Sequence, residues 1–207
     1  AGMRQAFRAL AERFVDEKSA PAKNTDAIKI NLLGLTPLDF SIVGNVEALL
    51  DWCANNHFDV VSSWAMNAND KSGELRTNAL GEPLASLPAI ARSAEADINL
   101  VLSSTALDAA KVLQERFGTP YVVGLPMGDA ACARMADLLK EAALTGVSKT
   151  LWETEAADAK GTTGAHALII GEPVYAASLR WVLGDRNIRV LCPLEDPCGC
   201  LRDTDLQ

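Results

Sequence analysis

Short, almost wholly apolar runs recur along the chain, each followed by a turn rich in Gly, Pro, Ser or Asp and then by an amphipathic stretch. The runs lie at 28–35, 58–62, 98–102, 121–125, 167–170 and 190–192. Runs that are apolar on both faces and separated by helical stretches indicate parallel strands covered on both sides by helices. The pattern predicts an α/β protein with a Rossmann-like parallel sheet flanked by helices, and then the beginning of a second α/β lobe.

The amphipathic stretches predict the helices. One face at helical spacing carries Met3, Phe7, Leu10, Phe14 and Val15, which indicates a leading helix. Further helices are expected after Asn45, over 84–94, 106–117 and 129–144, and between the last two strands. The long polar stretch 65–83 is predicted to be a surface loop.

Three segments follow from this order. Residues 1–26 form the leading helix and a polar linker, 27–160 the Rossmann-like domain with its following helix, and 161–207 a partial second lobe and tail. The boundary is placed near Gly161, where a Gly-Thr-Thr-Gly sequence breaks the chain. Roughly 45 residues are too few for an independent parallel layer. Either this part docks on the first domain, or the chain, which starts at Ala1, is a piece of a longer protein.

Charge and hydropathy exclude two classes of partner. The net charge is -8 and no cluster of Lys or Arg is longer than a neighbouring pair, which argues against nucleic acid. No run approaches the ~20 apolar residues of a membrane span, and the amino end lacks the plan of a signal peptide. We therefore expect a cytoplasmic protein with no nucleic acid and no membrane partner.

The five cysteines are expected to be reduced thiols, because no secretory signal is evident. Cys53 and Cys132 fall in helical stretches, where a small apolar core residue is the expected role. The other three lie within nine residues of one another: Cys192, Cys198 and Cys200. They are a weak alternative for a soft-metal site, but a closed zinc site needs four ligands and both histidines are far away in sequence. No metal site is assigned.

Candidate ligand-facing residues lie in the turns after the strands, because parallel sheets bind ligands beyond the carboxyl ends of their strands. They are Thr36, Asp39, Phe40, Trp64, Ser103, Ser104, Met127, Gly128 and Glu172. Asp39 can accept a hydrogen bond from a ligand or cap its own loop. Ser103 and Ser104 are more readily cap and turn residues than nucleophiles. No catalytic residue is assigned.

Motifs for nucleotide and acyl chemistry are missing. No G-x-G-x-x-G follows a strand, and the run from Gly124 to Gly128 carries bulky residues where a pyrophosphate would need close backbone approach. Gly146-Val-Ser-Lys149-Thr150 lacks the upstream glycine of a Walker loop. No G-x-S-x-G nucleophile elbow occurs.

Five segments occur in a specific order and span most of residues 27–192. They are Asn31-Leu-Leu-Gly-Leu-Thr-Pro-Leu-Asp-Phe40, Ala96-Asp-Ile-Asn-Leu-Val101, Glu115-Arg-Phe-Gly-Thr-Pro-Tyr121, Leu125-Pro-Met-Gly128 and Ile170-Gly-Glu-Pro173. In this order they resemble the middle of the component 1 proteins of nitrogenase and nitrogenase-like reductases.

The resemblance implies an oxidoreductase subunit or a cofactor-assembly relative, in nitrogen fixation or acting on another substrate. Family members have three Rossmann-like domains and take electrons from an ATP-driven iron protein through an iron-sulfur cluster. The implied partners are a homologous component 1 subunit and that iron-protein reductase, in an oligomer. The full-length assembly would hold an iron-sulfur cluster and a metallocluster.

The resemblance also implies what this chain lacks. The family's electron-entry cluster is bound by cysteines of an amino-terminal domain to which nothing here corresponds, so no cofactor is expected in this chain alone. The cysteine that holds the catalytic metallocluster matches Ser103, or Ser104 if the register moves by one. A neutral hydroxyl is a poor iron ligand. The match therefore implies the non-cofactor subunit or a nitrogenase-like protein with another substrate.

Two functions remain open. The chain is a fragment of a nitrogenase-like component 1 oxidoreductase subunit, inactive alone, or it is a non-redox scaffold of Rossmann-like fold that binds a metallocluster or a small ligand. Cysteines upstream of Ala1 in a longer sequence would favour the reductase.

Overall fold

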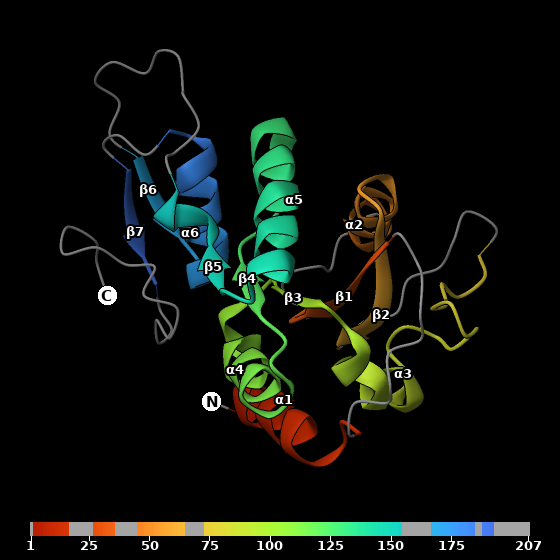
Figure 1. Ribbon diagram of the computed structural model, residues 1–207. Coiled ribbons are helices and arrows are strands. Elements are labelled where there is room, and N and C mark those ends of the chain that lie inside the picture. Colours follow the sequence, from red (N-terminus) through yellow and green to blue (C-terminus); the bar gives the residue numbers. More distant parts are fainter. Residues whose placement is uncertain are drawn as a thin grey trace.

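The computed structural model describes residues 2–16, 27–35, 45–64, 73–154, 167–184 and 188–192. Within these ranges a five-stranded sheet has the order β2-β1-β3-β4-β5, and every neighbouring pair is parallel (Figure 1). The strands are β1 (Ile28–Leu33), β2 (Phe58–Trp64), β3 (Ile98–Val101), β4 (Tyr121–Val123) and β5 (Lys149–Thr150). The predicted α/β class and the first four strands are confirmed.

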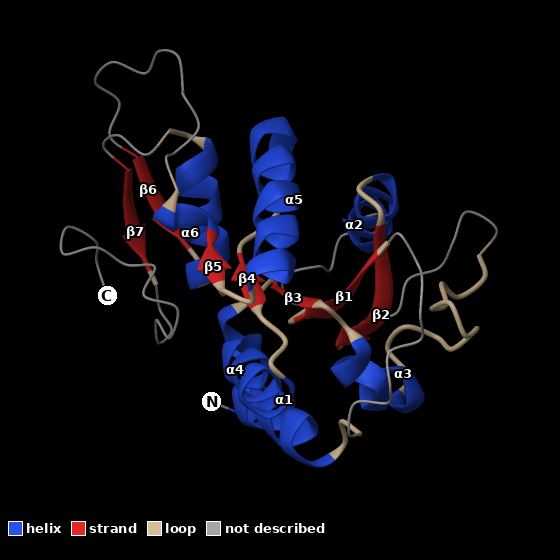
Figure 2. Ribbon diagram, in the orientation of Figure 1, coloured by secondary structure: helices blue, strands red, loops and turns tan. Residues whose placement is uncertain are grey.

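Helices cover both faces of this sheet. Figure 2 shows α1 (Gly2–Arg13), α3 (Leu87–Ala91) and α4 (Leu107–Phe117) on one face, and α2 (Asn45–Asn55) and α5 (Gly128–Thr145) on the other. Three short 3₁₀ helices are η1 (Arg92–Glu95), η2 (Ser104–Ala106) and η3 (Leu151–Glu153). Strand β3, in the middle of the sheet, is completely buried between the two helix layers. No helix of the described segments combines the length and hydropathy needed to cross a bilayer.

A second, two-stranded parallel sheet follows. It pairs β6 (Ala167–Ile170) with β7 (Ile188–Leu191), and α6 (Pro173–Val182) connects the two. Ile169 packs with Val190 beneath α6, whereas Leu168 and Ile170 are 52% and 64% exposed. The domain boundary expected near Gly161 lies outside the described residues and stays a prediction.

Two elements differ from the sequence expectation. Strand β5 was not expected, and α3 with η1 replaces a helix over 84–94. Ser86 caps α3, because its Oγ accepts a hydrogen bond from the Ala89 N–H at 3.3 Å. Pro88 is tolerated because it lies in the first turn, where its missing N–H has no intrahelical partner to lose.

The polar stretch after β2, expected to be a surface loop, packs against β2 where it is described. Residues 65–72 lie outside the described part, but residues 73–86 run along β2. The Ser63 N–H donates to the Leu84 carbonyl at 2.8 Å, and the Asn78 side-chain amide donates to the Val61 carbonyl at 3.2 Å. This segment therefore covers the edge of β2.

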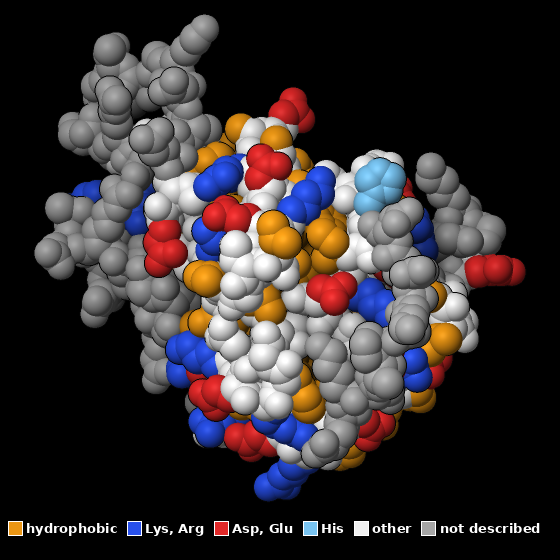
Figure 3. Space-filling model, viewed as in Figure 1, with side chains coloured by type: hydrophobic (Ala, Val, Ile, Leu, Met, Phe, Trp, Pro, Cys, Tyr) orange, Lys and Arg blue, Asp and Glu red, His pale blue; other side chains and the backbone are white. Residues whose placement is uncertain are grey.

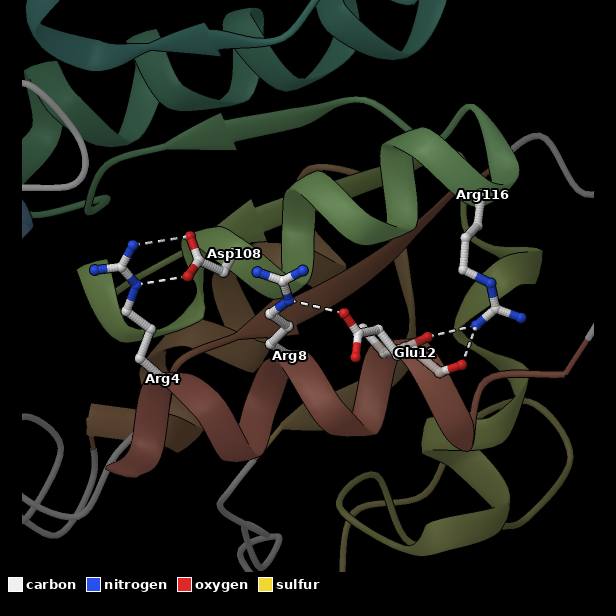
Figure 4. Close-up of polar contacts among 6 residues, drawn as sticks. Arg4, Arg8, Glu12, Asp108 and Arg116 are labelled. Carbon is white, nitrogen blue, oxygen red and sulfur yellow. Dashed lines mark hydrogen bonds and ion pairs between the residues drawn. The ribbon is translucent and has the colours of Figure 1, made fainter. Parts of the chain in front are cut away.

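Polar contacts fix α1 to α4 across a long sequence separation (Figure 4). The guanidinium of Arg4 makes two hydrogen bonds to Asp108, with Nε to Oδ2 at 2.6 Å and Nη2 to Oδ1 at 3.2 Å. Arg116 donates to the carbonyl oxygens of Glu12 and Val15 at 3.2 and 3.3 Å. A cation at the carboxyl end of a helix satisfies the last carbonyl groups and complements the helix dipole. Arg116 of α4 therefore stabilises the carboxyl end of α1.

A buried polar network crosses three strands on the face covered by α1 and α3. Asn31 of β1 donates from Nδ2 to Oδ1 of Asn99 in β3 at 2.8 Å and accepts at Oδ1 from Ser62 of β2 at 2.9 Å. The Trp64 indole N–H lies 3.0 Å from Ser62 Oγ and 3.1 Å from Ser93 Oγ. All five residues are fully buried. Paired polar groups in a low-dielectric core stabilise one arrangement of the side chains.

Candidate functional site

A pocket of about 330 Å³ lies at the carboxyl edge of the sheet, where α2, α5 and α6 meet the ends of β3 and β4. Its described lining residues are Asn45, Ala48, Leu49, Trp52, Leu102, Leu125, Pro126, Met127, Cys132 and Tyr175. This is the edge at which parallel α/β sheets bind ligands. Figure 3 shows hydrophobic side chains gathered between the positions of α5 and α2 on the viewed face.

The pocket wall is uncharged. None of the described lining residues is an Asp, Glu, Lys or Arg. Burial raises the pKa of the Cys132 thiol, and the negative charge of Asp129 raises it further. Since the thiol is therefore protonated at neutral pH, it adds a neutral, polarisable group to the wall.

The loop after β3 is joined to α6 by Glu172. One oxygen, Oε1, accepts from the Ser104 N–H at 2.6 Å, and Oε2 accepts from the Tyr175 N–H at 3.0 Å. Glu172 is thus the N-cap of α6, and the same carboxylate satisfies an amide of the β3 loop. This contact brings together two of the residues singled out in the sequence.

Ser103 acts as a local cap. Its side chain is fully buried, its Oγ accepts from the Thr105 N–H at 3.3 Å, and Oγ also lies 3.0 Å from the Thr105 hydroxyl. Gly34 approaches it closely: a Cβ built on Gly34 would lie 3.0 Å from the Ser103 Cβ and 3.1 Å from the Ala106 Cβ. Gly34 also has φ +88°, so both its conformation and its space require glycine.

The other candidate residues are dispersed. Met127 lines the pocket, and Gly128 is the exposed first residue of α5 with φ +70°. Trp64 does not face the crevice as expected, because its whole side chain lies in the core on the α1 face. Thr36, Asp39 and Phe40 lie outside the described residues.

Sequence reasoning singled out only Met127 among the described residues of the pocket wall and missed, among others, Trp52, Cys132 and Tyr175. All three lie within helices, and the search was limited to turns. One signal was available, since Trp52 falls off the apolar stripe of α2 formed by Val46, Leu49, Leu50 and Cys53. A large aromatic side chain at the flank of such a stripe contacts the core with one edge and leaves part of its ring for another contact.

Comparison with known proteins decides the family. A model of the family described as "Nitrogenase component 1 type Oxidoreductase" matches residues 1–192. The chain belongs to this family. A search of curated protein sequences gave no match.

Two solved nitrogenase structures share the fold of this chain. "Nitrogenase Cp1 at pH 6.5" has a TM-score of 0.50 at 13% identity over 92% of this chain and 35% of that chain. "Nitrogenase Cp1 at pH 5" has a TM-score of 0.52 at 13% identity over 100% of this chain and 41% of that chain. The chain thus spans less than half the length of either structure. At this identity the likeness is one of fold.

Family membership raises the question whether these residues fit a metallocluster. Ser103 is occupied as a cap, and Cys132 is a protonated thiol in an apolar wall. Cys192 is buried against Ala176 and Val190, while Cys198 and Cys200 lie outside the described residues. Among the described residues no group of three His, Cys, Asp or Glu side chains is placed to hold a metal ion. The described donor set therefore does not fit an iron-sulfur cluster or a metallocluster.

Proposed function

We propose that this chain is the Rossmann-like part of a component 1 subunit in a nitrogenase-like oxidoreductase whose full-length form performs ATP-driven reductive electron transfer. The observation that carries the proposal is the family match over residues 1–192. The chain also covers only 35% and 41% of the two nitrogenase structures that share its fold, which is consistent with a fragment of a longer subunit.

In this proposal the chain contributes architecture and other parts contribute the iron ligands. The apolar pocket and Ser103, whose hydroxyl caps its own turn, supply no thiolate, so the iron-sulfur cluster and any metallocluster belong to the remainder of the assembly. A homologous component 1 subunit and an iron-protein reductase are the proposed partners, in a cytoplasmic oligomer.

A second candidate is a non-redox scaffold with the same fold. The uncharged pocket wall favours it, because an organic ligand fits such a wall better than an anionic cluster does. The two candidates differ in redox activity: a reductase subunit accepts electrons from the iron protein, whereas a scaffold holds a metallocluster or a small ligand without being reduced.

The test compares the full-length gene product with this 207-residue chain. Both are purified anaerobically, reconstituted with iron and sulfide, and examined by metal analysis, visible absorption and EPR. We expect a cluster spectrum and stoichiometric iron in the full-length protein and neither in the chain alone. Addition of a reduced iron protein and ATP should then reduce the cluster of the full-length protein only.

Two results would contradict the proposal. Full-length protein that folds but is not reduced by the iron protein and ATP would favour the scaffold. Stoichiometric iron in the 207-residue chain, lost in Cys198→Ala but kept in Cys53→Ala, would make the tail a metal site. Cys53 is a suitable control because it is completely buried in the core.

A further inference from the structure

The composition of the pocket at the carboxyl edge disfavours anionic ligands. Its described wall holds no ionised side chain, and the one titratable group close to neutral pH, the Cys132 thiol, is kept neutral by burial. An anion placed there would lose hydration without gaining a charged partner. The chain's net charge of -8 disfavours anions further.

The wall offers two aromatic rings and a flexible thioether. Trp52 and Tyr175 are half-buried, so part of each ring stays accessible, and Met127, the residue before α5, is also half-buried. Aromatic faces favour offset or edge-on ring contacts, and methionine adapts its shape to the group it meets. Asn45 supplies an exposed carboxamide at the rim.

Size limits the ligand. The volume of about 330 Å³ lies at the lower end of the range of about 300 to 1,000 Å³ found for small-molecule sites. We propose that this pocket binds a small neutral organic molecule with one or two fused aromatic rings, placed against Trp52 and Tyr175. The proposal does not depend on the proposed redox function, because a reductase subunit and a scaffold contain the same pocket.

A pair of fluorescent probes tests whether the pocket prefers a neutral aromatic ligand to an anionic one. N-phenyl-1-naphthylamine is neutral, and 1-anilinonaphthalene-8-sulfonate has the same ring system with an added sulfonate. With the 207-residue chain we expect the neutral probe to saturate at one per chain and to bind at least about tenfold more tightly than the sulfonate. Equal affinity for the two probes, or no saturable binding of the neutral one, would overturn the proposal.

Pocket-filling variants test the location. Ala48→Phe and Cys132→Phe place a ring in the pocket from α2 and α5, and each should weaken neutral-probe binding by about tenfold or more. Ala133→Phe is the matched control, because Ala133 is exposed on α5 and is not a named wall residue. Unchanged binding in both filling variants would place the probe elsewhere and refute the site. Far-ultraviolet circular dichroism checks that each variant folds.

A measurement on the unmodified chain makes the test independent of the variants. The indole N–H of Trp52 should shift in ¹H–¹⁵N spectra when the neutral probe is added, while that of Trp64, buried on the other face of the sheet, should not. Trp52→Phe assigns the signal. A Trp52 signal that does not move, or one that moves with protein concentration alone, would overturn the proposal; the second result would make a second copy of the chain the occupant.

Discussion

Gly34 lies where the end of β1 meets the loop after β3, and its missing side chain sets the distance between them. Gly34→Ala should destabilise the fold by about 2 to 4 kcal/mol, because the substitution combines a positive φ with an overpacked contact at Ser103. Urea unfolding measures the change.

Gly118→Ala separates the two causes. Gly118 has φ +74° at the end of α4, and an added Cβ there would meet nothing within 4 Å. Its substitution should cost only about 1 to 2 kcal/mol, the conformational part alone. An equal loss in both variants would mean that close packing at Gly34 contributes nothing.

Cys53 gives a pH dependence of stability. Burial raises its pKa from 9.0 to about 12 in the folded chain. Between these pH values the unfolded chain loses the thiol proton and the folded chain keeps it, so the free energy of unfolding decreases as pH rises from 9 to 12. Cys53→Ala should show a shallower decrease over this window in urea titrations. Parallel slopes in the two proteins would refute the assignment.

The two helical cysteines show how well the burial of a side chain can be predicted from its place in a helical sequence pattern. Cys53 is a core residue, as its place on the apolar stripe of α2 predicted. Cys132 was expected to be a core residue for the same reason, but it is half-buried in a pocket wall. Whether a helical position meets the sheet or a gap between helices depends on packing between elements, which local periodicity does not contain.

At the scale of elements, the Glu172 carboxylate joins the loop after β3 to the start of α6. Glu172→Ala removes the acceptor for the amides of Ser104 and Tyr175 and should reduce the free energy of unfolding by about 1 to 3 kcal/mol. Hydrogen exchange at these two amides should accelerate. Glu115→Ala, on the exposed side of α4, is the control and should leave both exchange rates unchanged. Unchanged exchange in Glu172→Ala would show that the contact is dispensable.

Elements were predictable where an apolar run was long enough to be distinct. Strands β1 to β4 follow from such runs, and α5 follows from its composition and from Asp129 in its first turn. Strand β5 was missed because it has only two residues, Lys149 and Thr150, both half-buried and polar. Its strand geometry comes from pairing with β4, so it is set by tertiary structure.

At the scale of the whole molecule, the second sheet exposes apolar surface. Leu168 and Ile170 lie on the face of β6 away from α6 and are more than half exposed. Because two strands bury too little surface alone, we predict self-association at micromolar concentration, visible by light scattering. Replacing both residues by Lys should reduce it, while Leu144→Lys, at the end of α5, should not. A monomer at all concentrations would contradict this prediction.

The candidate site was predictable in position but not in composition. The parallel topology predicts a site at the carboxyl edge, where the pocket lies; Met127 lines this pocket, and Glu172 caps α6, whose Tyr175 also lines it. Its aromatic wall was not predictable, because Trp52 and Tyr175 come from helices separated by more than a hundred residues. Their approach depends on how α2 and α6 pack, a property of the assembled layers.

The buried amides and hydroxyls of the central strands also determine the register in which these strands pair. Strands that are apolar on both faces look alike when slid past one another, so hydrophobicity alone does not distinguish the alternatives. A shift of β1 by one residue would turn Asn31 to the other face, away from Ser62 and Asn99. A buried amide left without its hydrogen-bond partners would lower the free energy of unfolding by about 1 to 3 kcal/mol. The buried polar side chains of the central strands therefore fix the register in which these apolar strands pair.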